Sequence, residues 1–355
     1  MPASGLNIVA IGGGTGLSTL LRGLKRFVKG EGPWSVDHLG AVVTVTDEGG
    51  SSGVLRKEFG MLPPGDIRNC IVALAEEERL LSQLFSYRFD TDSALKGHSL
   101  GNLLLTAMTD ITGSFDNAVL AASEVLAIRG EIYPSTLTDV RLRAELEDGS
   151  VLVGEVAISG SHIGEAPRTT VRHARITHLG IDPPDAAPTA GALAALAAAD
   201  LIIIGPGSLY TSVLPNLVIE PLAEALRNAR ALRVYVCNVM TQPNETDGYT
   251  AQDHLSAIAE HAGLVVDVMV MNGSRPSETI LANYAAMNQF PVRFDLEAIR
   301  ALGVTPFFGD IIATGAAGED DYVRHDPDAL AQTIFQIYDR YGRTLERMRK
   351  DAAQP

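Results

Sequence analysis

Three loops rich in glycine and hydroxyl side chains are the parts of this 355-residue sequence best suited to chemistry. The first loop, Gly12-Gly-Gly-Thr-Gly16, stands between an apolar run and a helical pattern. Glycines let the backbone approach an anion, and a helix that starts there offers unpaired N–H groups and a partial positive charge. This predicts a phosphate or pyrophosphate site, although a tight turn without a ligand would have the same composition. The candidate binding residues are Gly12, Gly13, Gly14, Thr15 and Gly16.

The second loop runs from Asp47 to Asp66 and carries a carboxylate at each end of a stretch rich in glycine and serine. Two carboxylates could hold a hydrated magnesium ion (Mg2+) through oxygen ligands, or place a base beside a phosphate. The alternative is a mobile surface loop in which Asp66 caps a helix that begins at Ile67. The Arg56 guanidinium group in the same stretch could neutralise a phosphate group. The candidate ligand-binding residues are Asp47, Ser51, Ser52, Arg56 and Asp66, with Asp47 and Asp66 as the metal candidates.

The third loop follows the most apolar stretch of the chain and begins Gly-Pro-Gly-Ser. Two glycines, three hydroxyl groups and a helix that starts beyond Pro215 would form a second anion site facing the first. Two such sites suggest two phosphates or a diphosphate, while a purely structural turn is the alternative. The candidate residues here are Gly205, Pro206, Gly207, Ser208 and Ser212.

Four further polar residues are placed to join the same site. His98 and Asn102 open a predicted helix, although a lone histidine is more often a capping or surface residue. Asn238 and Thr241 follow an apolar run, again at a point where a strand should end. We expect all four to form polar walls of the ligand site.

The elements that must position these loops alternate between strands and helices. We expect strands at residues 7–11, 39–45, 201–204, 232–236 and 265–270, and core helices at 17–27, 219–227, 252–262 and 326–348. Strand–helix–strand order predicts a parallel sheet with right-handed crossovers. The expected fold class is therefore α/β, a Rossmann-like doubly wound, mainly parallel sheet, with the ligand beyond the carboxyl ends of its strands.

A long segment interrupts this pattern. We expect residues 1–78 and 185–355 to form the core and 79–184 to form an insertion, helical over 79–130 (the helical half) and β-rich over 131–184 (the β half). Helices are predicted at 100–109 and 115–126. The helical half carries His98 and begins just after Asp66, so we expect it to complete the ligand pocket while the β half faces outward.

Composition narrows the function further. Apolar residues make up 46% and charged residues 20% of the chain, as in an ordinary folded protein, and the net charge of −15 argues against nucleic acid as a partner. No uncharged apolar run of about 18 residues occurs, and no basic or apolar leader precedes the first strand, so we expect a cytoplasmic protein without a membrane span. Two cysteines cannot form a disulfide framework.

Six motifs, in this order along the chain, together resemble one family. They are Gly12-Gly-Gly-Thr-Gly-Leu-Ser-Thr-Leu20, Val43-Thr-Val-Thr-Asp-Glu-Gly-Gly-Ser-Ser-Gly53, Pro63-Pro-Gly-Asp-Ile-Arg-Asn69, His98-Ser-Leu-Gly-Asn102, Gly205-Pro-Gly-Ser-Leu-Tyr-Thr-Ser212 and Asn238-Val-Met-Thr-Gln-Pro-Asn-Glu-Thr246. The sequence resembles the YvcK-like gluconeogenesis factor family of the CofD-like superfamily, which also contains 2-phospho-L-lactate transferase. The resemblance covers residues 7 to about 345.

The resemblance implies a homodimer that binds a uridine-diphosphate sugar, chiefly UDP-N-acetylglucosamine, in a bacterial cytoplasm. It implies a role in growth on gluconeogenic carbon sources, cell shape and peptidoglycan synthesis, with a cell-wall synthesis protein as a possible partner. In the transferase branch, the stretch matching Asp47 to Asp66 serves magnesium and the phosphoryl acceptor. The resemblance also places Tyr284 and Arg324 near the sugar nucleotide.

Three functions compete at this point. A sugar-nucleotide sensor without catalysis is the first, and a magnesium-dependent phosphoryl or phospho-ester transferase using Asp47 and Asp66 is the second. An NAD(P)-dependent dehydrogenase is the third, but Leu17 occupies the third glycine position of the dinucleotide fingerprint. Whether any reaction is catalysed stays open on the sequence.

Overall fold

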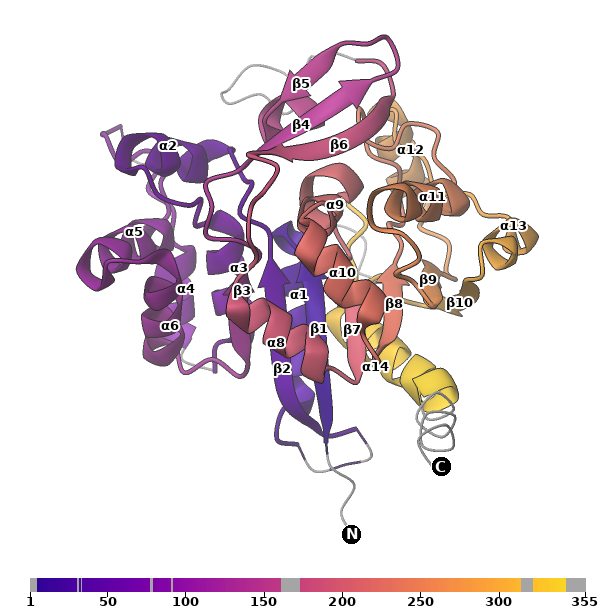
Figure 1. Cartoon of the computed structure of the whole chain (residues 1–355), viewed down its shortest axis with the longest axis horizontal. Coiled ribbons are helices and arrows are strands. Elements are labelled where there is room, and N and C mark those ends of the chain that lie inside the picture. Colours follow the sequence, from indigo (N-terminus) through magenta and orange to yellow (C-terminus); the bar gives the residue numbers. More distant parts are fainter. Residues whose placement is uncertain are drawn as a thin grey trace.

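A seven-stranded parallel sheet forms the centre of the computed structural model, which describes residues 5–30, 32, 34–76, 79–90, 92–160, 173–313 and 322–342 (Figure 1). Every neighbouring pair of strands is parallel. The expected α/β, Rossmann-like fold class is therefore confirmed. The strand order is β10 (Thr305–Gly309), β9 (Val268–Asn272), β8 (Leu232–Val236), β7 (Leu201–Ile204), β1 (Leu6–Gly12), β2 (Val36–Val43) and β3 (Glu131–Pro134).

Helices cover both faces of the sheet, which explains why its central strands are continuous apolar runs. All four residues of β7 are buried, because a parallel strand between two helical layers has no solvated face. One layer contains α1 (Gly14–Leu24), α3 (Gly65–Leu74) and α14 (Pro327–Ile337), and the other contains α8 (Ala190–Ala198) and α10 (Glu220–Asn228) (Figure 1). The strand ends Gly12, Ile204 and Val236 therefore meet at one edge.

Three local predictions differ from the structure. β3, which we placed in the β half of the insertion, pairs with β2 as an edge strand of the main sheet, because Ile132 and Pro134 are buried there. Residues 50–59, expected as a loop, form helix α2 (Gly50–Phe59). Asp66 is not the cap of a helix from Ile67, because α3 starts at Gly65 and Asp66 lies in its first turn.

The helical half contains α4 (Arg79–Ser86), α5 (Leu100–Thr112) and α6 (Phe115–Val125), beside α2 and α3 (Figure 1). The predicted helices at 100–109 and 115–126 are thus present. Ser99 caps α5 by accepting a hydrogen bond from the Asn102 backbone N–H. None of the helices in the described ranges is long and apolar enough to cross a membrane.

The β half forms a small antiparallel sheet, with β4 (Arg141–Leu146) between β5 (Val151–Val153) and β6 (Ile176–Asp182), and the short helix α7 (Glu155–Ser159). Residues 161–172 of the β half lie outside the described residues. The sheet is packed against the core, because the Leu179 N–H donates to Nε2 of His261 on α11 (Ala251–Ala262) at 2.8 Å and His178 stacks on the same ring. One face of the small sheet packs on the core in this way, while alternate residues of β4 and β6 are exposed, so the β half also keeps the expected outward face.

Candidate functional site

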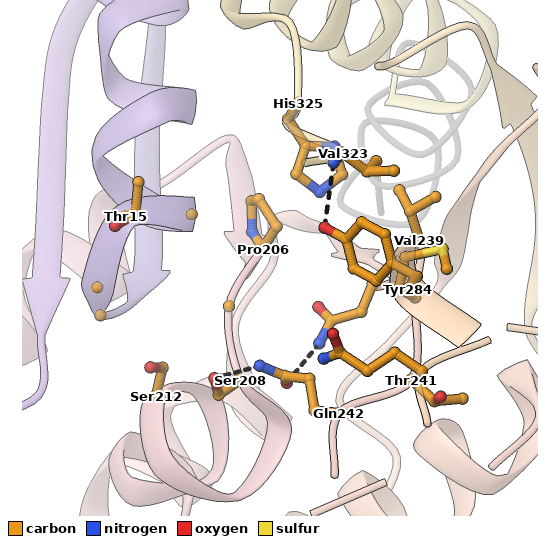
Figure 2. Close-up of a pocket in the computed structure, with 17 residues that line it drawn as sticks. Thr15, Pro206, Ser208, Ser212, Val239, Thr241, Gln242, Tyr284, Val323 and His325 are labelled. Carbon is orange, nitrogen blue, oxygen red and sulfur yellow. Dashed lines mark hydrogen bonds between the residues drawn. The ribbon is translucent and has the colours of Figure 1, made fainter. Parts of the chain in front are cut away.

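A cavity of about 330 Å³, here called the glycine pocket, lies at the carboxyl ends of β1, β7 and β8 (Figure 2). The first and third loops form one side of it, and residues 238–242 form another. Tyr284, Gln289, Val323 and His325 complete the opposite wall. Of the predicted site residues, the glycine pocket brings together Gly13, Gly14, Thr15, Gly16, Pro206, Gly207, Ser208, Ser212, Asn238, Thr241 and Tyr284.

The first loop places the start of helix α1 at the edge of this pocket. Helix α1 begins at Gly14, and its N-cap, Gly13, provides no side-chain cap for the first turn. Gly14 has a φ of +64°, in the left-handed region that favours glycine. A Cβ on Gly16 would lie 2.4 Å from the carbonyl oxygen of Pro206. The first and third loops are thus in direct contact, and that contact requires glycine.

The third loop is held by the segment that follows β8. The Gln242 side-chain amide donates to Oγ of Ser208 at 2.8 Å, and Asn238 donates to Oε1 of Gln242 at 3.1 Å (Figure 2). Glu245 accepts hydrogen bonds from the Tyr210 backbone N–H at 3.1 Å and from the Thr211 hydroxyl at 3.0 Å. Burial raises the pKa of Glu245 to about 7, although these hydrogen bonds favour its charged form.

The opposite wall is formed by α12 (Glu278–Ala286) and the segment before α14. The Val323 N–H donates to the Tyr284 hydroxyl at 3.0 Å, so the phenol is fixed at the pocket edge (Figure 2). Burial lowers the pKa of His325 to about 4, which leaves the ring neutral at pH 7. Nδ1 of His325 is buried without a hydrogen-bond partner in the part of the chain that the structure describes. Arg324, which stands between Val323 and His325 in the sequence, is exposed.

The second loop adjoins the glycine pocket but does not line it. Asp66 accepts a hydrogen bond from the backbone N–H of Gly14, and a Cβ on Gly13 would lie 2.6 Å from Oδ2 of Asp66. Burial and the neighbouring Asp47 raise the pKa of Asp66 to about 7. Burial and the same two aspartates, together with Glu245, raise the pKa of Glu155 on α7 to about 7. The β half thus adds a carboxyl group to those of Asp47 and Asp66. Asp47, Asp66 and Glu155 are here called the acidic region.

Asp47 and Asp66 could hold a metal ion only if a bound ligand and water supplied the other oxygen atoms. Among the described residues, no group of three or more His, Cys, Asp or Glu side chains is arranged to hold a metal ion. Asp47 and Ser52 lie close together, since a Cβ on Gly65 would be 2.5 Å from Oδ2 of Asp47 and 2.4 Å from Oγ of Ser52. Mg2+ is commonly held by one or two carboxylates, waters and substrate phosphates, and this donor set suits it.

Three predicted site residues form a separate cluster between α2 and the helical half. Oγ of Ser51 lies 3.0 Å from Nδ1 of His98, and Asn102 donates to the same Oγ at 3.1 Å. This cluster joins α2 to α5 and lies outside the lining of the glycine pocket. The helical half was expected to complete the ligand pocket, but His98 and Asn102 do not line the glycine pocket. Both hydrogen-bond to Ser51 of the second loop, which adjoins that pocket.

Arg56 points toward the β half and is absent from the glycine-pocket lining. Its guanidinium donates to the Val140 carbonyl at 2.6 Å and pairs with Asp139 at 2.5 Å and Glu48 at 3.6 Å. The side chain is only 6% exposed. Its observed role is to tie α2 to the small sheet.

Several pocket residues escaped the sequence analysis. Gln242 stands one residue after Thr241 within a motif that we had singled out, so its position was a usable signal. His325 likewise stands next to Arg324, which the resemblance had placed near the ligand, whereas Gln289 carries no local signal because it reaches the pocket from a loop after α12. Glu155 likewise stands in a short helix of the β half, which we did not connect with the acidic loop.

A parallel sheet whose carboxyl edge carries a glycine loop followed by a helix start defines a Rossmann-like α/β protein. The chain matches the model of the family described as 2-phospho-L-lactate transferase CofD over residues 8–312, and it belongs to this family. The family resemblance drawn from the six motifs is thereby confirmed.

Relatives with nearly full coverage sharpen this placement. The chain is 46% identical to the gluconeogenesis factor of Halalkalibacterium halodurans, over 96% of this chain and 99% of that protein. It is 43% identical to the gluconeogenesis factor of Bacillus subtilis, over 93% of this chain and 97% of that protein. A crystal structure of a Bacillus halodurans protein, described as a member of the UPF0052 family, has a TM-score of 0.84 and 43% identity, covering 94% of this chain and 99% of that one.

Proposed function

We propose that this chain is a regulatory factor that binds a uridine-diphosphate sugar, UDP-N-acetylglucosamine, in the glycine pocket. The observation that carries the proposal is the contact between two glycine loops around a helix start whose N-cap residue, Gly13, provides no side-chain cap. Backbone N–H groups at such a start favour a diphosphate without any basic side chain. The polar wall of Asn238, Thr241 and Gln242 offers amide and hydroxyl groups to a sugar.

The biological part of the proposal comes from the relatives called gluconeogenesis factors. We propose that the protein supports growth on gluconeogenic carbon sources in a bacterial cytoplasm. UDP-N-acetylglucosamine is also a cell-wall precursor, so a sensor of this ligand would link carbon supply to cell shape and peptidoglycan synthesis. A homodimer and a cell-wall synthesis partner belong to the same proposal.

Isothermal titration calorimetry with UDP-N-acetylglucosamine, GDP and NAD+, each with and without Mg2+, tests the ligand. We expect binding of the UDP-sugar that is independent of Mg2+ and stronger than that of GDP or NAD+. Tighter binding of NAD+ would contradict the proposal and favour a dinucleotide-binding protein. Tight GDP binding that requires Mg2+ would favour a transferase.

The acidic region supports a second candidate function, a magnesium-dependent phosphoryl or phospho-ester transferase. Burial raises the pKa of Asp66, and repulsion by the neighbouring Asp47 carboxylate raises it further. Bound Mg2+ would neutralise charge that develops on a transferring phosphoryl group. Asp47 and Asp66 would hold the ion, while the N–H groups of the first loop would orient the diphosphate beside it.

An Asp47→Asn, Asp66→Asn double variant separates the two functions. A transferase would lose its activity, whereas a sensor would retain most of its ligand affinity. The measurement is rescue of a deletion strain on a gluconeogenic carbon source, with an Asp92→Asn, Asp185→Asn variant at two exposed positions as the control. Full rescue by the Asp47, Asp66 variant would rule out the transferase.

A further inference from the structure

A second cavity, here called the side pocket, has a volume of about 420 Å³ and lies at the carboxyl ends of β8 and β9. Asn238 and Val239 line both the side pocket and the glycine pocket, so the two cavities share a wall. Helix α12 also serves both, because Leu281 lines the side pocket and Tyr284, three residues later on the same helix face, lines the glycine pocket. A ligand that lies over Asn238 and Val239 would reach both cavities.

The chemistry of the two cavities differs. The glycine pocket presents backbone N–H groups and polar side chains, whereas Met271, Leu281, Val292 and Phe294 give the side pocket apolar walls. Phe294 is 48% exposed, and its ring centroid lies 5.0 Å from that of Phe308. This half-exposed aromatic ring is a surface on which a flat ring can stack.

Size and charge decide which end of the ligand enters the side pocket. A volume of about 330 Å³ is near the lower limit of ligand pockets, which span roughly 300–1,000 Å³, so a whole sugar nucleotide needs further space. On the opposite side of the first loop stand Asp47 and Asp66, which favour a cation or polar groups rather than an apolar ring. The side pocket is the apolar direction available from the first loop.

We propose that the side pocket receives the nucleobase of the nucleotide whose diphosphate lies between the first and third loops. This inference rests on the proposed function and assigns one part of that ligand to one cavity. The base stacks against Phe294 and packs on Leu281. Asn272 and Ser274, which hydrogen-bond to each other at 3.1 Å in the lining, offer polar groups to the edge of the base.

The test compares UDP with UDP-N-acetylglucosamine. The two ligands share the uridine and the diphosphate, but only the second carries N-acetylglucosamine. Leu281→Trp fills the side pocket, and Leu120→Trp on α6, 58% exposed, is the control for a tryptophan on a helix. Phe294→Ala removes the aromatic surface at a half-exposed site and provides a second variant if Leu281→Trp does not fold. Affinities are measured by calorimetry and folding by circular dichroism.

We expect Leu281→Trp and Phe294→Ala each to weaken both UDP and UDP-N-acetylglucosamine by about tenfold or more, a factor that corresponds to about 1.4 kcal/mol. Leu120→Trp should bind both ligands like the wild type. Weaker binding of UDP-N-acetylglucosamine with unchanged UDP binding would place the sugar in the side pocket and overturn the inference. Unchanged binding of both ligands by folded variants would also overturn it. A wild-type protein that binds neither ligand would overturn the proposed function itself.

Discussion

At the residue scale, the glycine pocket depends on positions where a single methyl group would matter. Gly16 cannot carry a Cβ without meeting the Pro206 carbonyl oxygen at 2.4 Å, and Gly13 would meet Asp66 and Thr44, each at 2.6 Å. At Gly14 the space is larger, since the nearest atom to an added Cβ is Oγ of Ser212 at 3.6 Å. Gly14 therefore allows the pocket to be filled without pushing the two loops apart.

Gly14→Ala should reduce ligand affinity more than it reduces stability. Alanine at a φ of +64° costs about 1–2 kcal/mol of unfolding free energy, and the new methyl group would face Ser212 across the pocket. Gly60→Ala is a matched control, because Gly60 has a φ of +62° and no atom within 4 Å of an added Cβ. Both variants should show similar losses in urea denaturation, and only Gly14→Ala should lose affinity for UDP-N-acetylglucosamine. Equal affinities for the two variants would remove the first loop from the site.

Glu245 gives the protein a predictable pH dependence. Burial raises its pKa from 4.5 to about 7, so between these values the folded protein holds a proton that the unfolded chain releases. The unfolding free energy contributed by this group is therefore fully present below pH 4.5 and declines as pH rises to 7. Glu245→Gln keeps an oxygen acceptor, and the Thr211 hydroxyl can rotate to accept from the new amide.

We expect Glu245→Gln to show a smaller fall in melting temperature between pH 5 and pH 8 than the wild type. The melting temperature of the variant at pH 8 should equal or exceed that of the wild type. Glu58→Gln, at an exposed carboxylate, is the control and should follow the wild-type curve. A steeper pH dependence in Glu245→Gln than in the wild type would mean that the buried carboxylate stabilises the fold when ionised.

The three loops were predictable from their residue types. Glycine at those positions indicates a special backbone conformation, and serine and aspartate indicate polar or charged groups at a strand end. Gln289 was not predictable, because its place in the pocket depends on how the loop after α12 returns to the sheet edge. Arg56 was assigned to phosphate from its charge alone, and its contact with the Val140 carbonyl depends on a segment 84 residues later. Side-chain partners from distant segments are the part that local patterns do not contain.

At the element scale, the central strands could be predicted from their apolar runs, whereas the edge strands could not. β7 and β8 lie at the predicted residues 201–204 and 232–236, because buried parallel strands are continuously apolar. β10 contains Pro306 and ends at Gly309, residues that argue against a strand, and it is tolerated as an edge strand. β3 has four residues and joins the other edge, which a pattern of that length cannot indicate.

The buried arginine that joins α2 to the small sheet makes a stability prediction. Arg56→Met would remove the hydrogen bond to the Val140 carbonyl and the ion pairs with Asp139 and Glu48, at a cost of about 3 kcal/mol of unfolding free energy, although Glu48 keeps Arg141 at 3.4 Å. Arg26→Met is the control, because Arg26 pairs with Asp328 at the surface and such pairs contribute less than about 1 kcal/mol. Urea denaturation of the two variants gives both values. Similar losses would show that Arg56 does not hold the small sheet in place.

At the scale of the whole molecule, two regions meet at the first loop. The segment after β8 and helix α12 line the glycine pocket, whereas the acidic region includes Glu155 of α7. The hydrogen bond from Gly14 to Asp66 is the point where they touch. A ligand that fills only the glycine and side pockets should leave the helical half unaffected, while a ligand bridged by a metal should engage both regions.

Hydrogen exchange therefore distinguishes a sensor from a transferase across the whole chain. With UDP-N-acetylglucosamine alone we expect slower exchange at residues 13–16, 206–212, 238–242 and 284–289, because these segments line the glycine pocket. Exchange in α4, α5 and the small sheet should stay unchanged, since none of them lines it. Added Mg2+ should have no effect on a sensor. Protection that spreads with Mg2+ to residues 47–66 and into α5 would instead show that the acidic region binds the ligand through the metal, as a transferase requires.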